Sequence, residues 1–199
     1  MTTEQEQFWK GEFGNSYAKR NYGMTPNNIA FFARALQRAG AINSVIEFGA
    51  GTGQNLEALS RLYSYPQEMI GVEINEQAAM QNKIGKILRM SALDYSPAEY
   101  GKADLVLTKG FLIHLPPDDL PDMYEVLYGS TRRYILVCEY YNPTPVEVDY
   151  RGHKNKLWKR DFAGDLMYRF PDLCLVDYGF VYHRGAFPQD DLTWFLLEK

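Results

Sequence analysis

The chain has 199 residues, of which 46% are hydrophobic and 15% aromatic, enough to bury the core of one domain without disulfide bonds. A formal net charge of -4 disfavours a general affinity for nucleic acid or acidic membranes, because both need a positive field on the protein. The N-terminal residues do not resemble a signal peptide, and no apolar run approaches the ~20 residues that cross a bilayer. We expect a cytoplasmic globular protein with no nucleic-acid or membrane partner.

Apolar runs alternate with segments of helical period along most of the chain, a pattern typical of a parallel sheet with crossover helices. Helices are predicted at 27–36, 76–82 and 119–128, and a further helix is predicted from the glycine-rich turn after Phe48 to Tyr63. Strands are predicted at 44–48, 69–73, 87–90, 104–108 and 134–138.

The C-terminal part departs from this alternation. Residues 141–160 form a connection rich in proline, charge and aromatic residues, and a short helix through Phe162 and Leu166 follows. Strands at 173–182 and 192–198 are separated by a loop too short for a helical crossover, so they should pair antiparallel. The sequence predicts one domain over 1–199, with an N-terminal helical cap at 1–40 and a Rossmann-like α/β core at 41–199.

The two cysteines, Cys138 and Cys174, each lie in an apolar strand-like run. We expect both to be reduced, buried packing residues. No cysteine and histidine spacing is typical of a zinc site, so we expect no metal.

The turn after the first strand is the most informative stretch. Its three glycines at alternate positions allow positive φ and a close approach by a ligand. The dinucleotide fingerprint G-x-G-x-x-G would need glycine where the chain has Gln54. The acidic Glu47 would repel a pyrophosphate but can bind the ammonium group of a methionyl tail, directly or through water. The pattern therefore favours S-adenosylmethionine, with the following expected contacts: Glu47, Gly49, Ala50, Gly51, Gly53 and Asn55.

Acidic residues also follow the next two strands. Glu73, at the end of the second strand and followed by Ile74, can accept hydrogen bonds from both ribose hydroxyls of a nucleoside. After the third strand, Asp94 can accept from an adenine amino group while the Leu93 N–H donates to the ring. These four residues complete the adenosine side of the expected cofactor site.

With these motifs in this order, the chain resembles the class I S-adenosylmethionine-dependent methyltransferases. Over most of its length it is more specifically similar to the pseudaminic acid biosynthesis-associated methylases. The closer match rests on Phe8–Gly14 with Tyr17 and Arg20-Asn21, on Thr108–His114, on Glu139–Pro143, on Tyr150–His153 and on Lys159–Phe162.

The resemblance implies a seven-stranded sheet of order 3-2-1-4-5-7-6 with the last strand antiparallel, and Cys138 and Cys174 on non-adjacent strands. It also implies methyl transfer to a nonulosonic-acid or related sugar metabolite, with S-adenosylhomocysteine as the second product.

Acceptor residues should come from the segments after the fourth and fifth strands, because ligands bind beyond the carboxyl ends of parallel strands. Lys109 is expected to contact the cofactor and Phe111 the acceptor. His114 can act as a general base, or it can pack beneath the cofactor. Tyr140 and Tyr141 follow the fifth strand. Tyr140 is expected to be catalytic and Tyr141 to contact the acceptor, and ordinary packing is the alternative for both.

Two more segments carry candidates. The locally basic stretch offers Arg151, His153 and Arg160 to capture an acceptor carboxylate or phosphate, unless it is only a solvated loop. In the cap, Tyr17 and Arg20 can close over the cofactor, with Arg20 pairing to its carboxylate.

We therefore expect a methyltransferase acting on a small polar metabolite, anionic if the basic stretch binds it, in a monomer or homodimer. Three alternatives stay open: other chemistry on the same cofactor, a cofactor-binding subunit without activity, and a nicotinamide-dependent oxidoreductase.

Overall fold

Seven strands form one sheet in the order β3-β2-β1-β4-β5-β9-β8 in the computed structural model, which describes residues 3–20, 23–63 and 68–199. Residues 1–2 and 21–22 of the expected cap lie outside these ranges. The strands of this sheet are β1 Ser44–Phe48, β2 Glu68–Val72, β3 Lys86–Leu88, β4 Ala103–Lys109, β5 Thr131–Glu139, β8 Cys174–Val181 and β9 Leu192–Glu198. Counted along the chain, they give the expected order 3-2-1-4-5-7-6. The last strand, β9, runs antiparallel to both β5 and β8, which confirms the predicted terminal hairpin.

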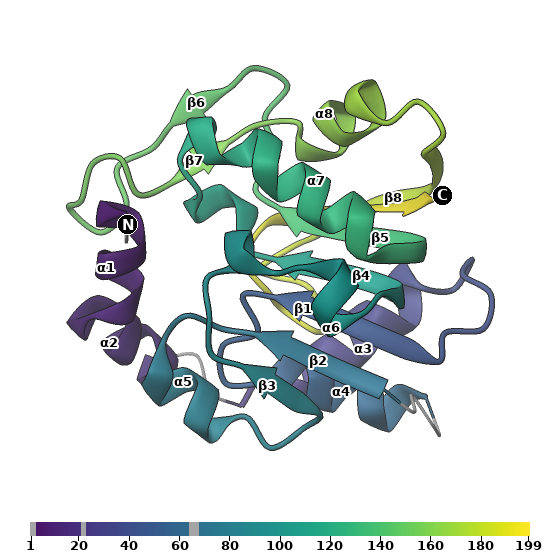
Figure 1. The fold of residues 1–199 in the computed structure, drawn as a ribbon, viewed down its shortest axis with the longest axis horizontal. Coiled ribbons are helices and arrows are strands. Elements are labelled where there is room, and N and C mark those ends of the chain that lie inside the picture. The colour runs from purple at the N-terminus through teal and green to yellow at the C-terminus, as the bar shows by residue number, and fades with distance from the viewer. Residues whose placement is uncertain (1–2, 21–22, 64–67) are drawn as a thin grey trace.

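Helices cover both faces of the sheet. They are α1 Glu4–Lys10, α2 Glu12–Arg20, α3 Thr25–Ala35, α4 Gln54–Leu62, α5 Glu76–Gln81, α6 Pro97–Tyr100, α7 Leu120–Ser130 and α8 Phe162–Arg169. Figure 1 shows α6 and α7 on one face of the sheet, α3 and α4 on the other, and α1 and α2 side by side beyond one end of it. The Rossmann-like fold class is thereby confirmed.

Alternating side chains of the central strands enter two separate cores, because successive residues of a strand point to opposite faces. Ile46 of β1 packs in the core under α7 and α8, whereas its neighbour Val45 packs with α3 and α4. All five residues of β1 are buried, as expected for a central parallel strand covered on both sides. Because helices pack on both faces of the sheet, the strand ends that carry the candidate site are held in place.

Two features differ from the sequence prediction. The connection at 141–160 contains a small antiparallel ribbon, β6 Val146–Glu147 paired with β7 Trp158–Lys159, which was not expected. Cys138 is buried as predicted, but the prediction for Cys174 was wrong, because this residue is exposed. Cys174 begins β8, which is an edge strand of the sheet and whose residues are exposed or half-buried. The two cysteines do lie on non-adjacent strands, since β9 separates β5 from β8.

Within the described residues, no helix has the length and apolar character needed to pass through a membrane.

Candidate functional site

A cavity of about 510 Å³ lies at the carboxyl ends of the parallel strands. Its wall is built from the turn after β1, the segments after β2, β3 and β4, the loop before β9, and helices α1 to α3. Parallel strands bring these separate segments of the sequence to one edge of the sheet, which is where α/β proteins bind ligands. The sequence-predicted residues that line it are Tyr17, Gly49, Ala50, Gly51, Asn55, Glu73, Ile74, Leu93, Lys109, Phe111 and His114.

The glycine turn and Glu73 are tied together by backbone hydrogen bonds. The Gly51 N–H donates to Oε2 of Glu73 at 2.7 Å, and the Asn75 N–H donates to Oε1 at 2.7 Å. Burial raises the pKa of Glu73, and these backbone N–H groups act in the opposite direction. The Ile74 backbone N–H also interacts with this carboxylate. A carboxylate has about four acceptor positions, so Glu73 keeps capacity for one further donor from a ligand.

Gly51 and Gly53 serve different purposes, although the sequence pattern treats them alike. A Cβ on Gly51 would meet no atom within 4 Å, and this residue, at φ 53°, lines the cavity. Gly53 does not line it. Gly53 is the N-cap residue of α4, with φ 83°, and a Cβ there would collide with the side chain of Asn82. The structure therefore gives Gly53 a packing position, away from the cavity that it was expected to line.

Glu47 is fully buried beneath the turn and does not line the cavity. Its Oε1 accepts a 2.6 Å hydrogen bond from Nδ2 of Asn55, whereas its Oε2 is buried without a partner in the described part of the chain. Burial raises the pKa of Glu47 to about 8, against the effects of the Asn55 hydrogen bond and the Lys109 charge. Asn55 reaches the cavity, and its own amide oxygen has no donor among the described residues.

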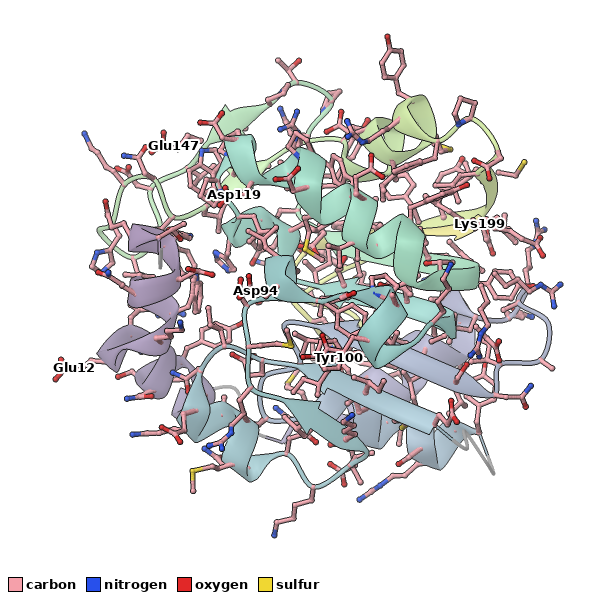
Figure 2. All side chains as sticks on the ribbon, in the orientation of Figure 1. Glu12, Asp94, Tyr100, Asp119, Glu147 and Lys199 are labelled. Atoms are coloured by element: carbon pink, nitrogen blue, oxygen red, sulfur yellow. The ribbon has the colours of Figure 1, made fainter. Side chains whose placement is uncertain are left out.

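On the far side of Glu73, the segment after β3 supplies Ser91, Ala92 and Leu93 to the wall. Asp94 is exposed and lies outside the lining. Figure 2 shows Asp94 and Asp119 on the side of the sheet that faces α1 and α2. Asp119 does line the cavity.

The segment after β4 is held by Glu139, a residue that the sequence analysis noted only as part of a family string. The Glu139 carboxylate is buried and accepts hydrogen bonds from the N–H groups of Phe111, Leu112 and Ile113 at 3.0 to 3.4 Å. Burial raises the pKa of Glu139 to about 7, and these backbone donors lower it. An acidic residue ending a buried strand was the available signal, because such a carboxylate needs several donors to remain buried.

His114 lines the cavity with little exposed surface. Its Nδ1 lies 2.8 Å from the carbonyl oxygen of Lys156, and its ring packs against Trp9 and Tyr150 with centroids 4.5 and 4.9 Å away. Burial lowers the pKa of His114 to about 4, so the ring is neutral near pH 7. Because a carbonyl oxygen only accepts, Nδ1 carries the proton and Nε2 is the acceptor of this imidazole.

Helices α1 and α2 form the outer wall of the cavity. Gln5 donates its side-chain N–H to the His114 carbonyl, and Asn75 donates from Nδ2 to the Trp9 carbonyl at 2.9 Å. Tyr17 lines the cavity, and burial raises the pKa of its hydroxyl. Arg20 is exposed, lies with its guanidinium 5.7 Å from the Phe13 ring centre, and does not line the cavity.

The structure does not bring the predicted acceptor residues of the 140–160 region into the cavity lining. Arg160 forms a 2.8 Å ion pair with Asp165, and the His153 ring packs 5.0 Å from the ring of Phe8. Arg151 and Tyr141 are exposed. Tyr140 is half-buried beside the cavity, where its hydroxyl interacts with the Asp190 carboxylate.

Sequence reasoning missed the loop before β9, which contributes His183, Pro188, Gln189 and Asp190 to the wall. It also missed Asn28 of α3, which is buried in the same wall. Neither segment carries a motif. For the loop, the only signal was its position in the sequence. A loop that leads into an antiparallel neighbour of β5 must pass the carboxyl end of β5.

No protein-family model matches this chain, and no curated protein matches it. Many solved structures share its fold. One is magnesium protoporphyrin IX methyltransferase from Synechocystis PCC 6803 with bound S-adenosylmethionine, at TM-score 0.68 and 13% identity over 99% of this chain and 98% of that one. Another is the 1,6-didemethyltoxoflavin-N1-methyltransferase of Burkholderia thailandensis, with bound 1,6-didemethyltoxoflavin and S-adenosylhomocysteine. Its TM-score is 0.68 and its identity 14%, over 98% of this chain and 86% of that one.

A third similar structure is a SAM-dependent methyltransferase from Archaeoglobus fulgidus, at TM-score 0.68 and 15% identity over 94% of this chain and 100% of that one. The chain thus has the Rossmann-like fold of these methyltransferases along nearly its whole length.

Proposed function

We propose that this chain, which has the Rossmann-like methyltransferase fold, binds S-adenosylmethionine in the cavity and transfers its methyl group to a small polar metabolite. The observation that carries the proposal is the Glu73 carboxylate, which is held by the Gly51 N–H in the cavity wall and retains acceptor capacity for a ribose hydroxyl. When bound, S-adenosylmethionine supplies an electrophilic methyl group on a sulfonium centre and leaves as S-adenosylhomocysteine.

The residues present fit this cofactor. Asn55 offers an amide oxygen without a donor to the methionyl ammonium group, and Glu47 orients that amide from below. Ile74, Ser91 and Leu93 line the wall next to Glu73, where the adenine would lie. Glu47 is therefore proposed to act through Asn55, in place of the contact, direct or through water, expected from the sequence.

Beyond the cofactor, the chain's own groups position the acceptor. Lys109, Phe111 and His114 line the cavity after β4, the position at which acceptor and methyl group would meet. His114 would accept a hydrogen bond through Nε2, because Nδ1 faces the Lys156 carbonyl. The lowered pKa of His114 makes it a weak base and suits it to orienting an acceptor.

The resemblance in sequence favours a nonulosonic-acid or related sugar-pathway acceptor, and we propose a cytoplasmic enzyme that acts as a monomer or homodimer without a nucleic-acid or membrane partner. An anionic acceptor was expected because of Arg151, His153 and Arg160. Since these residues do not line the cavity, they give that expectation no support.

The test is calorimetric titration with S-adenosylmethionine and S-adenosylhomocysteine, with Glu73→Ala as the variant. We expect binding in the micromolar range by the native chain and at least about tenfold weaker binding by Glu73→Ala, because hydrogen bonds to a charged group contribute about 1.5–3 kcal/mol each. Glu68→Ala is the matched control, since Glu68 begins the strand that Glu73 follows, is exposed and lies outside the cavity. Absence of binding of both compounds would overturn the proposal.

A further inference from the structure

The acceptor end of the cavity can be located from the sheet. The glycine turn, Glu73 and the segment after β3 occupy the carboxyl ends of β1, β2 and β3, so the proposed cofactor lies on that side. The opposite side is bounded by the end of β4 and by the loop before β9. Glu139 of β5 pairs with Thr193 of β9, which places this loop next to Tyr140.

Asp190 is the charged side chain that this loop adds to the cavity wall. Its carboxylate interacts with the Tyr140 hydroxyl and lies close enough to Tyr17 to help raise the pKa of that phenol, for which burial is the first cause. The two phenols therefore stay protonated. His183, which also lines the cavity, has its Nδ1 2.8 Å from Asp191.

Two buried amides beside Asp190 present acceptors without donors. Gln189 and Asn28 are 5% and 2% exposed, both line the cavity, and the side-chain oxygen of each has no hydrogen-bond partner within the described ranges. The loop is anchored, because Gln189 Nε2 donates to the Asn27 carbonyl at 3.2 Å and Asn27 Nδ2 donates to the Pro188 carbonyl at 2.6 Å. Buried acceptors without donors are costly, and a ligand that donates hydrogen bonds would relieve that cost.

Cations are scarce in this wall. Lys109 is the one lysine or arginine among the described residues that line the cavity, and its ammonium lies 5.9 Å from the centre of the Phe31 ring. Its charge also acts on the buried Glu47. A carboxylate or phosphate placed beside Asp190 would meet further acceptors and a like charge, which raises the free energy of the complex.

Resting on the methyl transfer proposed above, we infer that the acceptor is an amine, which Asp190, Gln189 and Asn28 bind as hydrogen-bond acceptors. Bound as an ammonium ion, the acceptor first gives one proton through the Asp190 carboxylate to water. The free amine then attacks the methyl carbon, and its lone pair forms the N–C bond. The C–S bond breaks with both electrons on sulfur, so that an N-methylammonium product and a neutral thioether remain.

In the experiment, the chain is saturated with S-adenosylhomocysteine and titrated with glucose and with three derivatives that each differ from glucose in one substituent. Glucosamine carries the amine, glucose is neutral, and glucuronate and glucose 6-phosphate carry anions. We expect glucosamine to bind at least about tenfold more tightly than either anion, equivalent to about 1.4 kcal/mol. Asp190→Asn should abolish this preference, whereas Asp118→Asn should keep it, because Asp118 is exposed and outside the cavity.

Two further measurements make the result decisive. The melting temperature and the S-adenosylhomocysteine affinity of Asp190→Asn should equal those of the native chain. Equal affinity for glucosamine and glucuronate, including no detectable binding of either, overturns the inference. So does a loss of S-adenosylhomocysteine affinity in Asp190→Asn with an unchanged preference, which would assign the carboxylate to the cofactor. If S-adenosylhomocysteine does not bind the native chain, the proposed function itself fails.

Discussion

Asn55 lies between the buried carboxyl group of Glu47 and the cavity. Its Nδ2 donates a 2.6 Å hydrogen bond to Glu47 Oε1, and of the two residues Asn55 alone lines the cavity. The acidic residue of the glycine-rich motif is therefore placed to fix the orientation of an amide.

The burial of Glu47 should make the stability of the chain depend on pH. The pKa of Glu47 is raised to about 8 from 4.5, so the native state favours the neutral carboxyl group. The contribution of this group to the free energy of unfolding is therefore fully present below pH 4.5 and is lost as the pH rises through 8. Glu47→Gln should increase the free energy of unfolding by a few kcal/mol at pH 8.5 (~1.4 kcal/mol per pKa unit) and by little at pH 5. Urea unfolding at both values measures this. Glu68→Gln is the control, and an equal effect of Glu47→Gln at both pH values would contradict the assignment.

Gly51→Ala and Gly53→Ala should separate ligand binding from folding. Both residues have positive φ, so each substitution costs about 1–2 kcal/mol in backbone strain. At Gly53 the new Cβ would also collide with Asn82, and the expected loss of stability is larger. At Gly51 the Cβ lies next to the cavity, so the affinity for S-adenosylhomocysteine should fall more than stability does. Thermal unfolding and calorimetry on both variants test this, and the reverse pattern would refute it.

Glu139→Gln should reduce turnover more than cofactor affinity. The variant keeps one acceptor oxygen for the N–H groups of Phe111, Leu112 and Ile113 and presents an amide donor to them. The segment that carries His114 would then lose its fixed position, with an expected tenfold or larger fall in kcat, since small misplacements of reacting groups cost about 100-fold. Affinity for S-adenosylhomocysteine should change less than about threefold. Glu12→Gln is the control, because Glu12 points away from the molecule on α2 (Figure 2).

His114 should make no contribution to the pH dependence of kcat/KM near the ordinary pKa of histidine. Burial lowers that pKa to about 4 from 6.5, so the ring is already neutral at pH 5.5. The profile of kcat/KM between pH 5.5 and 7.5 should therefore lack an inflection from this group. An inflection near 6.5 that disappears in His114→Gln would show a solvent-accessible base and contradict the buried arrangement.

The two thiols should differ in reactivity. Cys174 is exposed, whereas Cys138 is buried and has its pKa raised to about 12 by burial. Under native conditions iodoacetamide should modify one thiol per chain, as counted by mass spectrometry. Cys174→Ser should abolish this labelling and Cys138→Ser should keep it. Fast modification of the Cys174→Ser variant would show that β5 opens readily.

The sheet could be predicted because its strands are buried on both faces and leave strong apolar runs. Residues 44–48 and 192–198 were predicted with the bounds that the structure gives to β1 and β9. The ribbon of β6 and β7 could not be predicted, since each strand has two residues and no periodicity is visible at that length. The predicted burial of Cys174 was wrong because an apolar run does not reveal whether its strand has a neighbour on both sides.

The candidate site was predictable where a motif fixes the backbone, and less so elsewhere. Gly51 and Glu73 follow from the glycine pattern and from the strand end that comes next in the sequence. Arg160 was attractive for its charge alone, and the structure pairs it with Asp165. Asp190 was overlooked because two aspartates in a loop, Asp190 and Asp191, carry no pattern, and only the pairing of β9 with β5 brings Asp190 to the cavity.

Helices α1 and α2 contact the rest of the molecule at and beside the cavity and pair with no strand of the sheet. Gln5 reaches the His114 carbonyl, Asn75 reaches the Trp9 carbonyl, and Lys156 forms a 3.0 Å ion pair with Glu4. Removing the first twenty residues would leave every strand of the sheet paired and yet leave the cavity without one wall. The architecture of this chain and its capacity to hold a ligand are therefore separable properties, encoded by different stretches of sequence.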